Sequence, residues 1–275
     1  MSADPPRLRL LERPEEWSMM PGERAALEGV LSEIGPALSV EIGTYRGGSL
    51  VPISAHSQAV HVFDRERRPE LTAERFPNVT FHIGDSHELL PRALEEFAAS
   101  GQNVDFAFVD GDHTAPGARQ DVEDLLSSPS VGRSVILLHD TLNERVRAGL
   151  EEIDFASFPN VTFVDLDFVP GLVRREGALK DDFWSGLGLI VTGWKLAEED
   201  HWPAVYAVPD VYASFSEARA TSDQRQRIGY EQLLKLDGEL AEQKKIVSLM
   251  KNSLSWRITS PLRAVRQLSR RGTKP

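Results

Sequence analysis

Two pairs of acidic and histidine residues follow apolar segments in the middle of the chain. Asp110 and His113 come after the first of these segments, and His139 and Asp140 come after the second. Such apolar segments are typical of buried strands, and ligands of parallel α/β sheets bind beyond the carboxyl ends of the strands. Two carboxylates and an imidazole suit a hard divalent cation, with waters completing its coordination shell.

A glycine-rich segment, VEIGTYRGGS at 40–49, lies upstream of these pairs. An apolar run leads directly into Gly43, Gly47 and Gly48, which predicts a buried strand, a tight turn and the start of a helix. Glycine permits positive φ and a close approach of the backbone to a ligand, and a helix N-terminus offers free N–H groups. Glu41 stands out because a buried carboxylate needs a partner. This pattern indicates the first βα turn of a parallel sheet that binds a nucleotide-type cofactor.

The elements expected to position these residues alternate between strands and helices. Strands are predicted over 38–42, 60–64, 79–83, 104–110, 135–138, 161–168 and 187–194, and helices over 21–33, 49–57, 71–76, 87–99, 116–126 and 143–153. Asp64 ends the second strand, where an acid suits the ribose hydroxyls of a bound nucleoside; the alternative is a solvated loop aspartate. Residues 169–186 are expected to form a loop that covers a substrate.

The glycine segment resembles motif I of the class I S-adenosyl-L-methionine (SAM)-dependent methyltransferases, an acidic residue followed by G-x-x-x-G, and lacks the GxGxxG of dinucleotide sites. The resemblance implies an α/β fold with a Rossmann-like, seven-stranded sheet. It also implies that an acid after the third strand binds the adenine amino group, a position matched by Asp85 and Ser86; alternatively, these residues cap the following helix. The cofactor-binding residues implied for SAM are Glu41, Gly43, Thr44, Tyr45, Gly47, Ser49, Asp64, Asp85, Ser86 and Asp110.

The sequences FVDGDH and LLHDT together resemble the metal-dependent small-molecule O-methyltransferases, a group near the cephalosporin-hydroxylase-like proteins and the macrolide-sugar O-methyltransferases. In that fold the strands before the two sequences are neighbours, so their polar residues should converge. The resemblance implies Asp110 and Asp140 as Mg2+ ligands and His113 as the catalytic base. His139 stands where the group often has a second carboxylate, and it remains a candidate ligand through its imidazole.

Composition limits the class of protein. The 275 residues include no cysteine, which excludes disulfides and thiolate metal sites. No apolar run approaches the roughly 20 residues of a membrane span, and the first residues lack the apolar core of a signal peptide, so we expect a cytoplasmic protein. Residues 256–275 carry six basic and no acidic side chains, which leaves 25 basic against 42 acidic side chains before them. An acidic body argues against nucleic acid as a partner.

Four segments are expected along the chain: an N-terminal arm at 1–20, a methyltransferase domain at 21–215, an amphipathic or coiled-coil helix at 216–254 and a basic tail at 255–275. Residues 228–254 are a candidate surface for a homo-oligomer, or else a helix folded back on the domain. The tail is a candidate for peripheral contact with the inner face of the membrane, or else a disordered tail.

These observations favour a SAM-dependent O-methyltransferase that acts on a sugar or other glycan hydroxyl, assisted by a divalent cation. A sugar hydroxyl is a poor nucleophile at neutral pH, so a cation would lower its pKa and His113 would take its proton. The alternatives are a catechol-like phenolic O-methyltransferase and a non-catalytic SAM-fold partner tethered by its C-terminal helix. Asp112 is expected to support a turn, and the histidines expected to be structural or exposed are His56, His61, His82, His87 and His201.

Overall fold

The computed structural model of the protein describes residues 17–173 and 183–195, all within the unit Met1–Val211. The strands are β1 (Leu38–Ile42), β2 (Ala59–Asp64), β3 (Val79–Ile83), β4 (Phe106–Val109), β5 (Ser134–His139), β6 (Val161–Val169), β7 (Leu172–Val173), β8 (Phe183–Trp184) and β9 (Leu187–Thr192). The helices are α1 (Pro21–Ile34), α2 (Leu50–His56), α3 (Ser86–Ala99), α4 (Ala115–Ser127) and α5 (Glu144–Glu151), with 3-10 turns at Pro129–Val131 and Phe155–Ser157.

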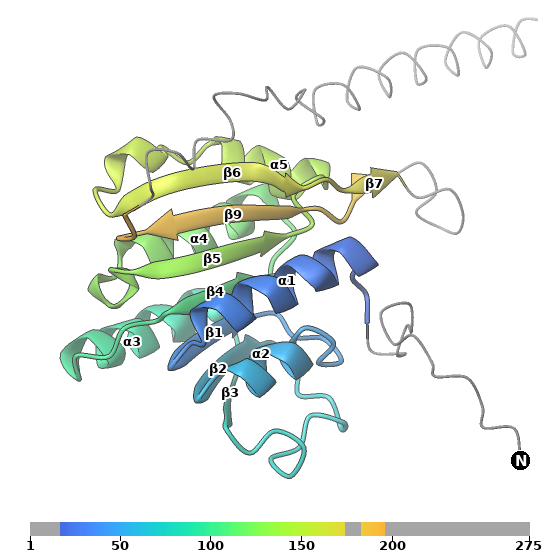
Figure 1. Ribbon diagram of the computed structural model, residues 1–275, viewed down its shortest axis with the longest axis vertical. Coiled ribbons are helices and arrows are strands. Elements are labelled where there is room, and N and C mark those ends of the chain that lie inside the picture. The colour runs from blue at the N-terminus through green and yellow to red at the C-terminus, as the bar shows by residue number, and fades with distance from the viewer. Residues whose placement is uncertain (1–16, 174–182, 196–275) are drawn as a thin grey trace, which may run out of the picture. The chain divides into compact units, whose positions relative to one another are not determined.

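Seven strands form one sheet in the order β3-β2-β1-β4-β5-β9-β6 (Figure 1). Neighbours from β3 to β5 pair in parallel, whereas β9 lies antiparallel between β5 and β6. This arrangement confirms the predicted α/β fold with a Rossmann-like, seven-stranded sheet. It also makes β1, β4 and β5 neighbours, so the residues that follow these strands lie side by side.

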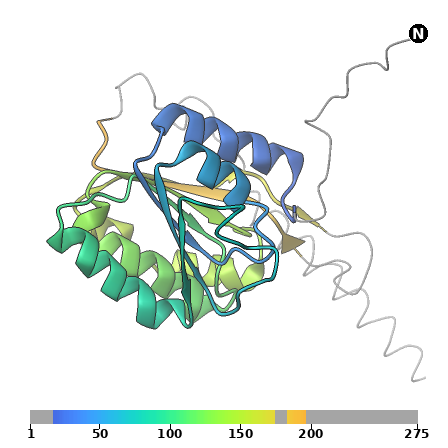
Figure 2. The same cartoon turned by 90° about the horizontal axis from the view of Figure 1, so that it is seen from below.

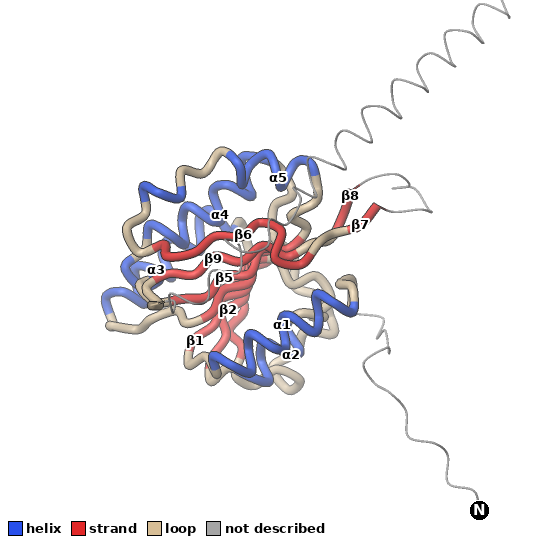
Figure 3. The backbone as a smooth tube through the Cα atoms, turned by 45° about the horizontal axis from the view of Figure 1, so that its top comes forward, coloured by secondary structure: helices blue, strands red, loops and turns tan. Residues whose placement is uncertain are grey.

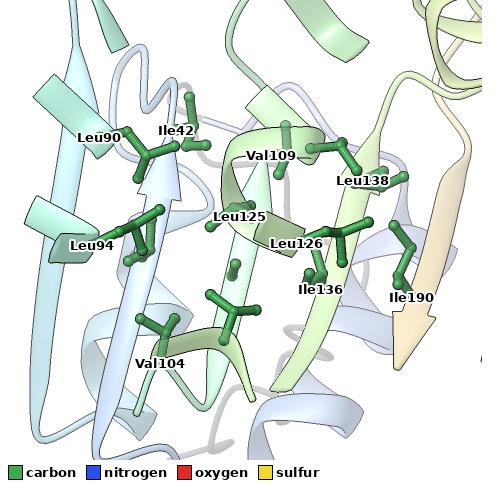
Figure 4. Packing of buried hydrophobic residues seen from close by; sticks show 14 of the residues in the cluster. Ile42, Leu90, Leu94, Val104, Val109, Leu125, Leu126, Ile136, Leu138 and Ile190 are labelled. Carbon is green, nitrogen blue, oxygen red and sulfur yellow. The ribbon is translucent and has the colours of Figure 1, made fainter. Parts of the chain in front are cut away.

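Helices cover both faces of the sheet. Figure 2 shows α1 and α2 on one face and α3, α4 and α5 on the other. Every residue of β1 and β4 is buried, as expected for central parallel strands with helices on both sides. Successive side chains point to opposite faces, and on the face of α3 and α4 this produces the core of Figure 4, where Ile42, Val109 and Leu138 pack with Leu90 and Leu125.

The predicted helix at 71–76 is wrong. This segment consists of turns and extended residues, and its one helical-type hydrogen bond runs from the Phe76 N–H to the Thr72 oxygen. Leu71 and Phe76 are buried and pack near Gly47. With Pro77 following, the segment is too short to continue as a helix, and it serves instead as an anchor beside the glycine turn.

Within the segment 169–186, predicted as a loop that covers a substrate, the described residues include β7 and β8, which pair as two antiparallel strands. Most of the predicted N-terminal arm lies outside the described residues. The same holds for all of the predicted helix at 216–254, the oligomer surface at 228–254, the basic tail at 255–275 and His201. Among the helices of the described part, none is long and apolar enough to cross a bilayer.

Two of the histidines expected to be structural contact each other. His61 Nδ1 lies 2.9 Å from His82 Nε2, and the His82 ring stacks on Phe63. Burial lowers the pKa of His61 to about 4. The pair therefore forms part of the packing between β2 and β3, away from the residues at the strand ends.

Candidate active site

The candidate site lies at the carboxyl ends of β1, β4 and β5. The start of α1 and the β7–β8 hairpin lie at the same end of the sheet (Figure 3). Parallel α/β sheets bind ligands at this edge. The structure therefore brings together the glycine turn after β1 and the polar residues after β4 and β5, as the sequence predicted.

The glycine turn after β1 is held close to the end of β4. Gly43 has φ 78°, and a Cβ atom at this position would lie 2.1 Å from the Asp110 carbonyl oxygen. Only glycine fits this combination of positive φ and backbone contact. Asp64 Oδ2 accepts hydrogen bonds from the N–H groups of Thr44 and Tyr45, at 2.9 and 3.1 Å. Asp64 thus shapes the turn in addition to lining the cavity beside it.

Glu41 lies beneath this turn and is fully buried. Its Oε1 accepts a hydrogen bond from the Ser49 hydroxyl, and its Oε2 has no hydrogen-bond partner among residues 17–173 and 183–195. Burial raises the pKa of Glu41 to about 8, although the hydroxyls of Ser49 and Thr44 favour the ionised form. Glu41 lines neither cavity described below, so its observed contacts are with the turn.

Substituting Glu41 by Gln should change how stability depends on pH. The folded-state pKa near 8 exceeds the ordinary glutamate pKa of 4.5, so the folded protein binds more protons than the unfolded chain between these values. The free energy of unfolding should therefore fall as pH rises from 4.5 to 8, and this slope should disappear in Glu41→Gln. At pH 8 the variant should be more stable by about 2–4 kcal/mol, as measured by urea unfolding across pH. An unchanged slope would contradict this account.

Asp110 connects two histidines. Its Oδ1 lies 3.1 Å from His113 Nε2 and 3.1 Å from His139 Nδ1. Asp140 lies on the other side, with Oδ1 at 3.7 Å from His139 Nδ1 and Oδ2 at 3.7 Å from His113 Nε2. His139 and Asp140 are buried, whereas Asp110 and His113 are partly exposed. The four predicted residues therefore form one contiguous cluster.

The charges of this cluster depend on one another. Burial opposes the charged form of His139, but the carboxylates of Asp110 and Asp140 raise its pKa well above the ordinary value. Burial likewise favours neutral Asp110, but His139 and His113 hold the pKa of Asp110 below its usual range. The hydrogen bond with Asp110 raises the pKa of His113. The cluster thus favours ionised Asp110 next to a cationic group.

Asp110, His139 and Asp140 could also hold a metal ion. One ligand atom from each residue lies within 4.8 Å of the others. Two carboxylate oxygens and one imidazole nitrogen suit Mg2+ or Mn2+ better than softer thiolate-preferring ions. The three residues predicted as metal ligands therefore meet the geometric requirement for a shared cation.

The main chain at Asp140 is unusual, because this residue has φ 54°. Its Oδ1 accepts a hydrogen bond of 2.6 Å from the Ser185 N–H. Ser185 and Gly186 also have positive φ, at 64° and 92°. The turn between β8 and β9 therefore fixes the orientation of the Asp140 carboxylate.

Asp85 and Asp112 serve as local caps. Asp85 precedes α3 and accepts a hydrogen bond from the His87 N–H. Asp112 accepts a hydrogen bond from the Thr114 N–H, as expected for a residue that supports the turn. The Ser86 hydroxyl donates a hydrogen bond of 3.0 Å to the fully buried Asp121. Ser86 lines the smaller cavity.

Two cavities meet at the cluster. The smaller, of about 210 Å³, is lined by Gly43, Asp64, Gly84, Ser86 and Asp110 among others. The larger, of about 550 Å³, extends over the other side of the cluster and is lined by Trp17, Thr44, Tyr45, Gly48, Ser49, Asp110, His113, His139, Asp140 and Trp184 among others. Tyr45 and Asp110 line both cavities. Gly47 lines neither and instead packs against Leu71.

Three further residues lie near the cluster. Trp184 belongs to the segment at 169–186 that was predicted to cover a substrate, whereas Trp17 and Glu23 were not predicted as site residues. Trp184 lies edge-on to His113, with ring centroids 5.8 Å apart, and Trp17 lines the larger cavity. Glu23, near the start of α1, is 1% exposed and lies 3.6 Å from His139 Nε2. The sequence signal for Glu23 was its position just after Pro21, where an acid supports a helix N-terminus.

Residues 40–141 match a protein family described as a methyltransferase domain. The matched segment begins in β1 and ends just after Asp140, so it includes the glycine turn and all four residues of the cluster. Together with the strand order, this match confirms the predicted resemblance to the class I methyltransferases. Among curated proteins, none matches the chain.

Solved structures similar to this chain include three O-methyltransferases. The enzyme from Bacillus cereus, solved in complex with SAH, is 17% identical, with 65% of this chain and 84% of that chain covered and a TM-score of 0.46. TomG from Streptomyces achromogenes, solved with SAM and involved in tomaymycin synthesis, has 17% identity, coverages of 64% and 82%, and a TM-score of 0.46. A putative O-methyltransferase from Klebsiella pneumoniae has 16% identity, coverages of 66% and 84%, and a TM-score of 0.45.

Proposed function

We propose that this chain is a SAM-dependent O-methyltransferase that methylates a hydroxyl group of a sugar or glycan with the help of a divalent cation. The observation that best supports this proposal is the position of Asp110. Its side chain contacts both His113 and His139, and the residue lines both cavities. A base and a set of cation ligands thus lie where two bound molecules would meet, which is the arrangement that transfer between them requires.

The smaller cavity suits the adenosine part of SAM. The backbone at Gly43 allows close approach, and Asp64 and Ser86 offer polar groups to a ribose and a base. Thr44, Tyr45 and Ser49 border the larger cavity beside Asp110, where the amino-acid part would extend. When bound, SAM supplies the methyl group that is transferred.

The larger cavity suits a small acceptor, because about 550 Å³ lies within the range of small-molecule sites. Asp110, His139 and Asp140 would hold Mg2+ or another divalent cation, which when bound lowers the pKa of an acceptor hydroxyl. His113, whose Nε2 lies 3.1 Å from Asp110 Oδ1 and 3.7 Å from Asp140 Oδ2, would serve as the base that accepts the hydroxyl proton. Trp17 and Trp184 would exclude water and provide aromatic surface for the acceptor.

Binding and transfer assays would test this proposal. SAM and Mg2+ should both bind in isothermal titration calorimetry, and methyl transfer should be detectable with hydroxylated sugars, nucleotide sugars or glycans. Absence of SAM binding would contradict the proposal and favour a non-catalytic partner. Contact of the basic tail with a membrane, self-association through residues 228–254 and a cytoplasmic location are separate proposals that membrane flotation, sedimentation and cell fractionation would test.

Substitution of His113 by Gln would separate a sugar acceptor from a phenolic one. A sugar hydroxyl needs help to lose its proton, so kcat/KM should fall by about 10²–10⁴-fold without the base. A catechol-like phenol is more acidic, so kcat/KM for transfer to it should fall far less. Transfer rates with matched sugar and catechol acceptors would measure this difference, and equal losses with both would contradict the assigned role of His113.

A further inference from the structure

We propose that Glu23 is a positioning residue of the candidate metal site: its carboxylate lies behind His139 and turns the imidazole toward Asp110 and Asp140. This inference rests on the proposed function, because it concerns the same cation site. It adds a fourth side chain, contributed by α1 rather than by a strand end.

The two ring nitrogens of His139 face different partners. Nδ1 faces the cluster, 3.1 Å from Asp110 Oδ1 and 3.7 Å from Asp140 Oδ1. Nε2 faces away from these carboxylates and lies 3.6 Å from Glu23 Oε1, and within the described part of the chain it forms no hydrogen bond. Nδ1 is therefore the nitrogen available to a cation shared with Asp110 and Asp140. Nε2 would then carry the proton and point it at Glu23.

The carboxylate of Glu23 is held in place by the main chain. Its Oε2 accepts a 2.6 Å hydrogen bond from the Met20 N–H, and its Oε1 accepts a 2.5 Å hydrogen bond from the Gly186 N–H. The preceding N–H group, that of Ser185, donates to Asp140. Two successive N–H groups of one turn thus hold carboxylates that contact opposite nitrogens of the His139 ring.

This arrangement has a known physical effect on a metal-binding histidine. A carboxylate at the second ring nitrogen fixes the tautomer and orientation of the imidazole and makes it a stronger ligand. Removal of such a partner typically weakens metal affinity by about 10–100-fold. Because Glu23 is buried at 1% exposure, its negative charge is poorly screened by water and acts strongly on the adjacent ring.

A double-mutant cycle on the full chain would test this inference. Mn2+ affinity would be measured by calorimetry for the wild type, Glu23→Gln, His139→Gln and the double variant. We expect Glu23→Gln to weaken Mn2+ binding by about 10–100-fold in the wild-type background, and by less than about threefold in the His139→Gln background. This difference is expected because Glu23 acts through His139, whereas a merely structural role would cost the same in both backgrounds.

Glu28→Gln provides the matched control. Glu28 lies on the same helix, is partly exposed and pairs with Arg24, so the same change of charge there should leave Mn2+ affinity unchanged. If Glu23→Gln does not fold, Glu23→Asp would replace it in the cycle, with a smaller loss expected. Equal losses of Mn2+ affinity in both backgrounds, or no loss of affinity at all, would overturn the role of Glu23. A wild type that binds SAM but not Mn2+ would overturn the cation part of the proposed function, and with it this inference.

Discussion

Asp110→Asn should abolish detectable Mg2+ binding and reduce the rate of methyl transfer by at least about 10³-fold. A loss of this size is typical when a catalytic group is removed from an enzyme. Asp110 Oδ1 is the shared partner of His113 and His139. The substitution removes one of two carboxylates from the candidate cation site, and it also removes the charge that raises the pKa of His113. The ligand set and the base would therefore fail together.

Calorimetry with SAM would show that this loss is chemical rather than structural. The atoms nearest to a Cβ atom placed on Gly43 are main-chain atoms of Asp110 and Gly111, and the substitution leaves this main chain in place, so SAM affinity should change by less than about tenfold, under 1.4 kcal/mol. Asp154→Asn is a suitable control because Asp154 is exposed and lies beyond α5. Asp110→Asn with normal Mg2+ affinity would exclude Asp110 as a ligand.

Gly43→Ala should destabilise the protein by more than about 3 kcal/mol and eliminate SAM binding. A methyl group at this position would lie 2.1 Å from the Asp110 carbonyl oxygen and 2.9 Å from the Gly111 Cα. These are backbone atoms, so no side-chain movement can relieve the contact, and the φ of 78° disfavours any residue with a Cβ atom. The protein could accommodate the methyl group only by moving the end of β1 away from the end of β4.

Urea unfolding and SAM titration would measure these two effects. Gly29→Ala is the matched control, because Gly29 lies inside α1 and a Cβ atom there would meet nothing within 4 Å. That substitution should stabilise the protein by about 0.5–1 kcal/mol, since alanine is the better helix former. A Gly43→Ala protein as stable as the wild type would show that the turn after β1 and the residues after β4 are not in close backbone contact.

The residues at strand ends could be predicted from sequence because the signals are local. An apolar run that ends in an acid, as at Asp110 and Asp140, marks both the strand and the edge where it ends. The only further information needed was that β1, β4 and β5 are neighbours in the sheet. The 71–76 segment was misassigned because its apolar residues, Leu71 and Phe76, are buried for a tertiary reason, their packing beside Gly47, and not as one face of a helix.

Contacts that join distant parts of the chain could not be predicted. Glu23 and Gly186 are 163 positions apart, and a glutamate near the start of a helix usually needs no other explanation. The Ser185 N–H that orients Asp140 is likewise a main-chain group, which no residue type reveals. The sequence therefore indicated which side chains could perform chemistry but not the groups that hold them in place.

The position of β9 has a consequence for how the protein is made. β9 is the last described strand to be synthesised, yet it lies between β5 and β6. Until it emerges from the ribosome, β5 has an unpaired edge, which is prone to association with other chains. The turn that precedes β9 carries the N–H groups of Ser185 and Gly186. A nascent chain would thus contain Asp110, His139 and Asp140 before it could orient them, and insertion of one late strand would complete the sheet and the site in the same step.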